Sequence, residues 1–301
     1  MTAAALDMAR AQVDAALDRG DAAALRRLGA QIDARLASGR VDALRAARQV
    51  RGVDRVRDRR RFKSAAVPDG DYSKQAAPGV TGTLFPGRVS GLVPGEPVLK
   101  DGANNAKIGG DVHRGRLRGA HIVTLTLEER ATCPRSCRHW RGCMGNGMQF
   151  ARRWQHGPAL EARLAEEIPA LIAAHGRLLV RLHVLGDFYS LDYVGFWHGL
   201  LAAHAGLTVF GFTAHAPDQG IGRAVAKLNT DFPSRAFLRF SERTGPDGAF
   251  TLPFPTDARR IGDAIVCPEQ TDAMAGAPRS IHCGNCGHCW AHRRPIAFVR
   301  H

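Results

Sequence analysis

The chain has 301 residues, of which 45% are hydrophobic, so it is long enough for one large domain or for one domain with an extension. Its formal net charge of +14 comes mainly from arginine and favours a polyanionic partner, with DNA or RNA as the first expectation. No apolar run reaches the roughly 20 residues that span a bilayer, and the first residues contain no hydrophobic signal core. The composition therefore argues against an integral membrane protein and predicts a cytoplasmic one.

Residues 1–63 are predicted to form a helical, basic extension. Apolar residues recur there at helical spacing, as in Leu25, Leu28 and Ile32. The segment 51–63 is dense in arginine, and it is either a solvated linker or an arm that contacts phosphates.

Residues 65–119 are rich in Gly, Pro, Asn and Asp and show little periodicity. Short strands are expected at residues 81–85 and 98–100. So long an irregular run is typical of a wrapping segment or a mobile lid.

From residue 121 onward, predicted strands alternate with predicted helices, which implies parallel strands joined by right-handed crossovers. Ser190 is the expected N-cap of one helix. We predict an α/β fold, a partial or complete (β/α) barrel of parallel strands within residues 64–301. The expected strands cover residues 122–127, 178–184, 207–213, 235–240 and 263–266, and the expected helices cover residues 160–175, 191–204 and 221–228.

The first expected strand leads into a loop with Cys133, Cys137 and Cys143, spaced by three and then five residues. Three thiolates can hold a metal centre and leave one coordination position open for a substrate or cofactor. Trp140 is expected to shield this centre from water, and neighbouring arginines are expected to lower the thiolate pKa values. The alternative is a set of buried cysteines without a ligand.

A second group consists of Cys267, Cys283, Cys286 and Cys289, and the two groups together account for all seven cysteines. The glycine-spaced run CGNCGHC is typical of iron–sulfur loops, and zinc is the alternative metal, with Cys267 or His292 as the fourth ligand. We expect this C-terminal Cys-rich metal-binding loop, within residues 267–289, to be structural. Clustered cysteines indicate metal binding more than a disulfide framework.

The other candidate residues also follow predicted strands, at the edge where parallel β/α folds collect their chemistry. Gly186 and Asp187 follow the second strand, and Ser241 and Glu242 follow the fourth. Asp187 is a candidate for binding a cofactor amino group or for a nucleophile, with a helix N-terminal acid as the alternative. Glu242 is a candidate for holding ribose hydroxyls, with an exposed ion pair as the alternative.

Several motifs together resemble the phage and plasmid "gene product 88" family of uncharacterised proteins, over roughly residues 105–290. They are TCPRSCRHWRGCMGN, RLHVLGDFYSLDYVGFW, VFGFTAHAP, CPEQ and CGNCGHCW. The layout of that family is in turn similar to the radical S-adenosylmethionine superfamily, whose three-cysteine loop follows the first barrel strand.

The resemblance implies a [4Fe-4S] cluster on Cys133, Cys137 and Cys143, whose open iron chelates S-adenosylmethionine. It also implies contacts from Gly186 and Asp187 to the cofactor amino group, a ribose contact from Ser241 or Glu242, and an auxiliary cluster on the four C-terminal cysteines. The superfamily spaces its cysteines by three and then two residues, whereas this chain has three and then five. Zinc therefore stays an alternative.

Three hypotheses follow. The first is a radical S-adenosylmethionine-type enzyme, in which a 5′-deoxyadenosyl radical abstracts hydrogen from a nucleic acid or nucleotide. The second is a zinc- or cluster-stabilised nucleic-acid-binding protein without catalysis. The third is a DNA base transglycosylase-like barrel with Asp187 as nucleophile and a zinc site.

Overall fold

A computed structural model of the chain describes residues 76, 80–252, 258–274 and 281–299. The chain divides into two units, Met1–Lys63 and Ser64–His301, and the described residues all belong to the second unit. The helical, basic extension predicted for residues 1–63 lies outside the described residues.

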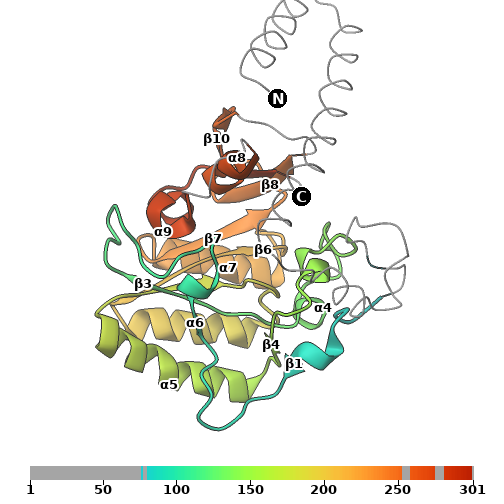
Figure 1. Cartoon of the computed structure of the whole chain (residues 1–301), viewed down its shortest axis with the longest axis vertical. Coiled ribbons are helices and arrows are strands. Elements are labelled where there is room, and N and C mark those ends of the chain that lie inside the picture. The colour runs from blue at the N-terminus through green and yellow to red at the C-terminus, as the bar shows by residue number, and fades with distance from the viewer. Residues whose placement is uncertain (1–75, 77–79, 253–257, 275–280, 300–301) are drawn as a thin grey trace, which may run out of the picture. The chain divides into compact units, whose positions relative to one another are not determined.

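The described unit is an α/β structure built on a mostly parallel nine-stranded sheet (Figure 1). The strand order is β2-β3-β5-β6-β7-β8-β11-β10-β9, and the five strands from β3 to β8 are parallel neighbours in chain order. The strands are β2 (Lys100–Asp101), β3 (His121–Thr124), β5 (Leu178–Leu182), β6 (Leu207–Thr213), β7 (Ala236–Ser241), β8 (Gly248–Leu252), β9 (Arg260–Ile261), β10 (Ala264–Val266) and β11 (Ile296–Val299), while β1 (Val89–Ser90) and β4 (Arg153–Trp154) pair separately.

The sheet ends in β2 and β9, each of which is antiparallel to its neighbour. No pairing between β2 and β9 is present in the described part of the chain. The structure thus shows an α/β fold with a parallel-rich central sheet, and it does not show a complete barrel.

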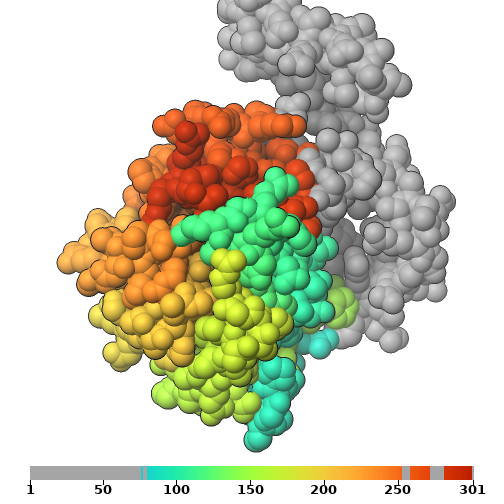
Figure 2. Space-filling model, turned by 90° about the vertical axis from the view of Figure 1, so that its left-hand side faces the viewer, coloured from blue at the N-terminus to red at the C-terminus, as the bar shows by residue number. Residues whose placement is uncertain are grey.

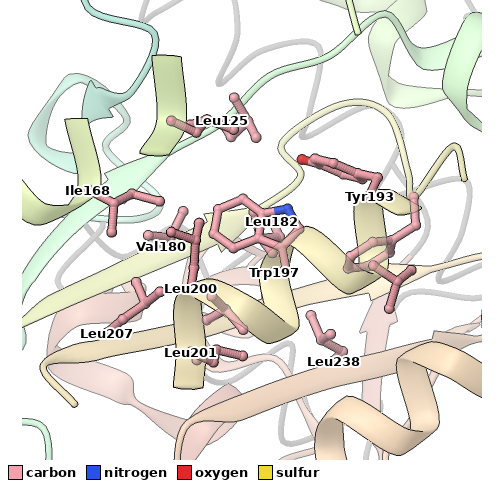
Figure 3. Close-up of a cluster of buried hydrophobic side chains, with 14 of the residues drawn as sticks. Leu125, Ile168, Val180, Leu182, Tyr193, Trp197, Leu200, Leu201, Leu207 and Leu238 are labelled. Atoms are coloured by element: carbon pink, nitrogen blue, oxygen red, sulfur yellow. The ribbon is translucent and has the colours of Figure 1, made fainter. Parts of the chain in front are cut away.

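One face of the sheet is covered by α5 (Pro158–His175), α6 (Leu191–Ala203) and α7 (Gly220–Asp231). Every second residue of a strand points to this face, as in Val180 and Leu182 of β5, which pack against Trp197 of α6 (Figure 3). The hydroxyl of Ser190 accepts a hydrogen bond from the backbone N–H of Tyr193, which confirms the predicted N-cap of α6.

The opposite face of the sheet is covered by chain segments far apart in sequence. Leu179, Phe210 and Phe237 of three neighbouring strands pack there against Trp290 of α10 (His288–Ala291). The ring centroids of Phe210 and Trp290 are 4.8 Å apart. Residues 102–120 complete this second core, beside the C-terminal segment with α8 (Pro268–Met274) and α9 (Cys283–Cys286), as Figure 2 shows.

Two short strands expected before residue 100 are wrong. Residues 81–85 form no strand, because the hydroxyl of Thr83 bonds to Glu129 and to the backbone N–H of Phe85, and a 3-10 turn follows at Pro86–Arg88. Only Lys100 of the expected strand 98–100 lies in a strand, since the N–H groups of Val98 and Leu99 donate to the Glu167 carboxylate. Within the part of the chain that the structure describes, no helix combines the length and apolarity needed to cross a membrane.

Candidate metal centres

The three-cysteine loop (residues 133–143) begins directly after α4 (Glu129–Thr132), which follows β3. Cys133 caps the C-terminus of α4 through its N–H, and Cys143 caps the next 3-10 turn, where its Sγ accepts from the N–H of Gly145 at 3.4 Å. Local backbone structure therefore fixes the main chain at Cys133 and both the main chain and the sulfur at Cys143.

The three thiols are electrostatic neighbours. Burial raises the pKa of Cys133, and the charges of Asp187, Cys137 and Cys143 raise it further. Burial also raises the pKa of Cys143 to about 11, with a further contribution from Cys137. The thiols are thus protonated at neutral pH, and a bound cation would be needed to convert them to thiolates. Among the described residues, no three Cys, His or carboxylate side chains already stand in metal-binding geometry.

A buried ion pair fixes both ends of this loop. The guanidinium Nε of Arg153 donates to Oε2 of Glu129 at 2.7 Å, and the two side chains are 0% and 1% exposed. Arg153 also donates to the carbonyls of Gly145, Met148 and Ala151. Because Glu129 lies four residues before Cys133, the pair joins the start of the loop to its end.

Arg130 and Trp140 hold the middle of the loop. One nitrogen of Arg130 donates to the carbonyl of Trp140 at 2.9 Å and to Oδ1 of Asn146 at 2.8 Å. The indole N–H of Trp140 donates to the carbonyl of Val80, and the guanidinium of Arg135 lies 4.7 Å from the indole ring. Trp140 is half-buried, and these contacts make it an anchor of the loop. The sequence predicted only that it would shield the cysteines from water.

Gly186 and Asp187 lie at the carboxyl end of β5, against the three-cysteine loop. Gly186 has a φ of +90°, and a Cβ there would lie 2.6 Å from that of Leu127 and 2.7 Å from the Thr132 hydroxyl. Only glycine fits this contact. Burial and hydrogen bonding fix Asp187, which is 2% exposed.

Both carboxylate oxygens of Asp187 already have backbone partners. Oδ1 accepts from the N–H of Phe188, and Oδ2 accepts from the N–H of Ala214, each at 2.7 Å. Its own N–H donates to the Thr132 hydroxyl. Burial raises the pKa of Asp187, and the bond from Ala214 opposes that rise. Asp187 thus links the ends of β5 and β6 to α4, and a ligand would use its remaining lone pairs.

Ser241 and Glu242 lie at the carboxyl end of β7 and complete the same edge of the sheet. A hydrogen bond of 2.8 Å joins Oε1 of Glu242 to Nε2 of His139 in the three-cysteine loop. The charge of Glu242 also raises the pKa of Cys137, for which burial is the first cause. The structure therefore brings together the cysteine loop, Asp187 and Glu242, as the sequence predicts. His139 was not selected from the sequence as a site residue. Its position between Cys137 and Cys143 was the one sequence feature that pointed to it.

The four C-terminal cysteines line one hollow. Cys267 follows β10, Cys283 and Cys286 bound α9, and Cys289 lies in α10. Burial raises the pKa of Cys267 to about 12, and the neighbouring Cys289 raises it further. The side chain of His282 borders the same hollow, so this donor set fits a metal bound by four thiolates.

Two guanidinium groups accompany the four-cysteine site, one from the half-buried Arg181 and one from the buried Arg239. Arg181 of β5 stacks on Phe210 and Phe212 at 5.5 and 4.6 Å, and burial lowers its pKa while Cys283 and Cys289 oppose that shift. Arg239 of β7 donates to the carbonyls of residues 288, 289, 292 and 294. Sequence reasoning missed both arginines, because each looks like an interruption of an apolar strand.

Comparison of the chain with protein-family models, with curated proteins and with solved structures gave no match.

Proposed function

We propose that the chain is an iron–sulfur protein of the phage and plasmid family that its motifs resemble, and a radical S-adenosylmethionine-type enzyme acting on a nucleic acid or nucleotide. One observation carries the proposal: the thiols of Cys133, Cys137 and Cys143 are neighbours at the carboxyl edge of a parallel sheet, beside Asp187 and Glu242. The chain-order strands with helices on one face support a partial (β/α) barrel, which the resemblance implies.

In this proposal the three cysteines hold a [4Fe-4S] cluster with one open iron. Cluster and S-adenosylmethionine together supply reductive cleavage of a sulfur–carbon bond and hydrogen abstraction from the substrate, with the electron coming from an external one-electron donor. Glu242 has one oxygen bonded to His139, and its second oxygen serves a ribose hydroxyl, with Ser241 beside it. Asp187 holds the ends of β5 and β6 in place and offers its free lone pairs to the cofactor amino group.

A second candidate function is a zinc- or cluster-stabilised nucleic-acid-binding protein without catalysis. The four thiols around one hollow, with Arg181 and Arg239 beside them, favour a structural metal there under either function.

Metal and sulfide analysis of anaerobically purified protein tests the proposal. The wild type is compared with Cys133→Ala/Cys137→Ala/Cys143→Ala and with the matched variant Cys283→Ala/Cys286→Ala/Cys289→Ala. We expect brown wild-type protein with equal iron and sulfide, and loss of iron and sulfide in the first variant in proportion to one cluster. Colourless protein that holds zinc on the first three cysteines would overturn the iron–sulfur assignment.

Binding of radiolabelled S-adenosylmethionine separates an enzyme from a cluster-stabilised binding protein. Equilibrium dialysis under anaerobic conditions should show saturable binding by the wild type and by the variant in the second cysteine group. The variant in the first group should show none. Binding that is equal in both variants would place the cofactor elsewhere and reject an open iron at Cys133, Cys137 and Cys143.

A further inference from the structure

The amino edge of the sheet, opposite the three-cysteine loop, is densely basic. Four exposed arginines belong to it: Arg114, Arg116 and Arg118 in the segment 102–120, and Arg294 just before β11. A fifth, Arg260, lies on the outermost strand β9, opposite Ile265 of β10. We call these five residues the basic face. Figure 2 shows the segment 102–120, in green, against the C-terminal segment in red.

Contacts place these residues on one surface. Arg177, just before β5, donates to the carbonyls of Arg116 and Arg118 and so fixes that loop at the amino edge. The guanidinium groups of Arg116 and Arg293 both lie over the ring of Phe237, at 5.4 and 5.7 Å. Arg294 is the next residue along the chain after Arg293.

Contacts between chain segments join the remaining arginines to this surface. The N–H of His113, the neighbour of Arg114, donates to the carbonyl of Gly284 at 2.9 Å, so the segment 102–120 lies against the C-terminal segment. Arg260 of β9 lies opposite Ile265 of β10, and Ile265 in turn lies opposite Ile296 of β11, two residues after Arg294.

The basic face lacks the carboxylates that would neutralise it. Among the residues that the structure describes, none of its five guanidinium groups has a carboxylate within ion-pair distance. The carboxylate of Asp111, in the same segment, is bonded to His121 instead. Five such guanidinium groups would attract a ligand that carries several negative charges in a row. Each planar guanidinium can donate two parallel hydrogen bonds to the oxygens of one phosphate.

We propose that the basic face binds the phosphate backbone of a nucleic acid and anchors it away from the cysteine loop. The inference deepens the proposed function, which supplies its nucleic-acid substrate class. Strand β6 has seven residues, so the two edges of the sheet are about 20 Å apart. A strand held at the basic face must therefore extend for several nucleotides before it reaches the carboxyl edge.

Fluorescence anisotropy with the full chain tests the basic face. The probes are fluorescein-labelled DNA and RNA single strands and a DNA duplex, each about 20 nucleotides long. The test variant is Arg114→Ala/Arg116→Ala/Arg118→Ala. The matched control is Arg163→Ala/Arg223→Ala/Lys227→Ala, which removes the same charge from α5 and α7.

We expect the test variant to weaken binding at least tenfold for every sequence, and to reduce the slope of log K against log salt by about 2 to 3. The control should change binding less than threefold. Equal effects in both variants, or none in the test variant, would overturn the basic face as the binding surface. Unchanged metal content of the test variant shows that it is folded.

Vesicles of phosphatidylcholine with phosphatidylserine supply the competing outcome. Vesicle binding that the test variant abolishes, with no nucleic-acid binding by the wild type, would overturn the assignment in favour of an anionic membrane. The anisotropy measurement does not depend on iron or sulfide. A negative anisotropy result therefore rejects only the basic face, whereas metal and sulfide analysis tests the enzyme proposal separately.

Discussion

Oε2 of Glu129 lies 2.7 Å from Nε of Arg153, and both side chains are buried. Removing one partner of such a pair leaves a charge buried without compensation. We expect Arg153→Met to lower the free energy of unfolding by about 3 to 5 kcal/mol, as measured by urea denaturation. Under the proposed iron–sulfur function, iron bound by Cys133, Cys137 and Cys143 should fall as well, because Arg153 donates to the carbonyl of Gly145, two residues after Cys143.

The pair of Arg152 and Glu96 is the matched control for this variant, since its side chains are 28% and 36% exposed. Arg152→Met should lower the free energy of unfolding by less than about 1 kcal/mol. If the free energy of unfolding fell equally in the two variants, the buried pair would contribute no more to stability than the exposed pair.

Gly186→Ala tests the close approach of the β5 end to α4. An added methyl group would overlap Leu127 and Thr132, and the φ of +90° disfavours any side chain. We expect a loss of about 2 kcal/mol or more in urea denaturation. Gly199→Ala, inside α6 with open space around its Cα, should instead leave stability unchanged or raise it by up to about 1 kcal/mol. A tolerated Gly186→Ala would contradict the packing described here.

If the four C-terminal cysteines hold a metal, as proposed, Arg239→Met should weaken its binding. The guanidinium of Arg239 donates to the carbonyls of His288 and His292, on either side of Cys289, and its charge lowers the pKa of the Cys289 thiol. We expect metal on the second group to be lost to a chelator about 10 to 100 times more readily, while the first group keeps its metal. Arg235→Met is the control, since Arg235 bonds the carbonyls of Leu201 and His204, away from the cysteines.

Glu242→Gln should reduce binding of S-adenosylmethionine about tenfold or more without loss of iron, because a carboxylate accepts hydrogen bonds from ribose hydroxyls more strongly than an amide does. Asp247→Asn is the control, since Asp247 has a φ of +56°, close to the +57° of Glu242, and is paired with Arg293. Cofactor affinity that stays the same in Glu242→Gln would remove Glu242 from the ribose contact.

Local sequence patterns were sufficient for the strands and helices that follow one another in alternation. β6 coincides with its predicted bounds, and α5, α6, α7 and β10 lie within a few residues of theirs. β8 and β11 were missed, because β8 follows β7 after only six residues with no helix between them, and β11 enters the sheet out of chain order. Such pairings depend on contacts distant in sequence, which periodicity does not report.

The alternation of strands and helices also made the position of the candidate site predictable, but not the contacts within it. The carboxyl ends of parallel strands share one edge, so Cys133, Asp187 and Glu242 could be placed together from their order alone. The side chains that hold them could not, since the partners of Arg153 and Arg239 come from loops whose paths no pattern reveals. His139 lay between two candidate ligands, yet its bond to Glu242 spans 103 positions in sequence.

The position of β11 between β8 and β10 has a consequence for biosynthesis. A nascent chain emerging from the ribosome can assemble β3 through β8 in order, but the strand that joins β8 to β10 is translated last. Until residue 299 has left the exit tunnel, β10 has no parallel neighbour, and Cys267 and Cys289 lack the frame that brings them together. The frame that brings these two cysteines together thus closes only when β11 joins the sheet, so this strand pairing comes after the assembly of β3 to β8.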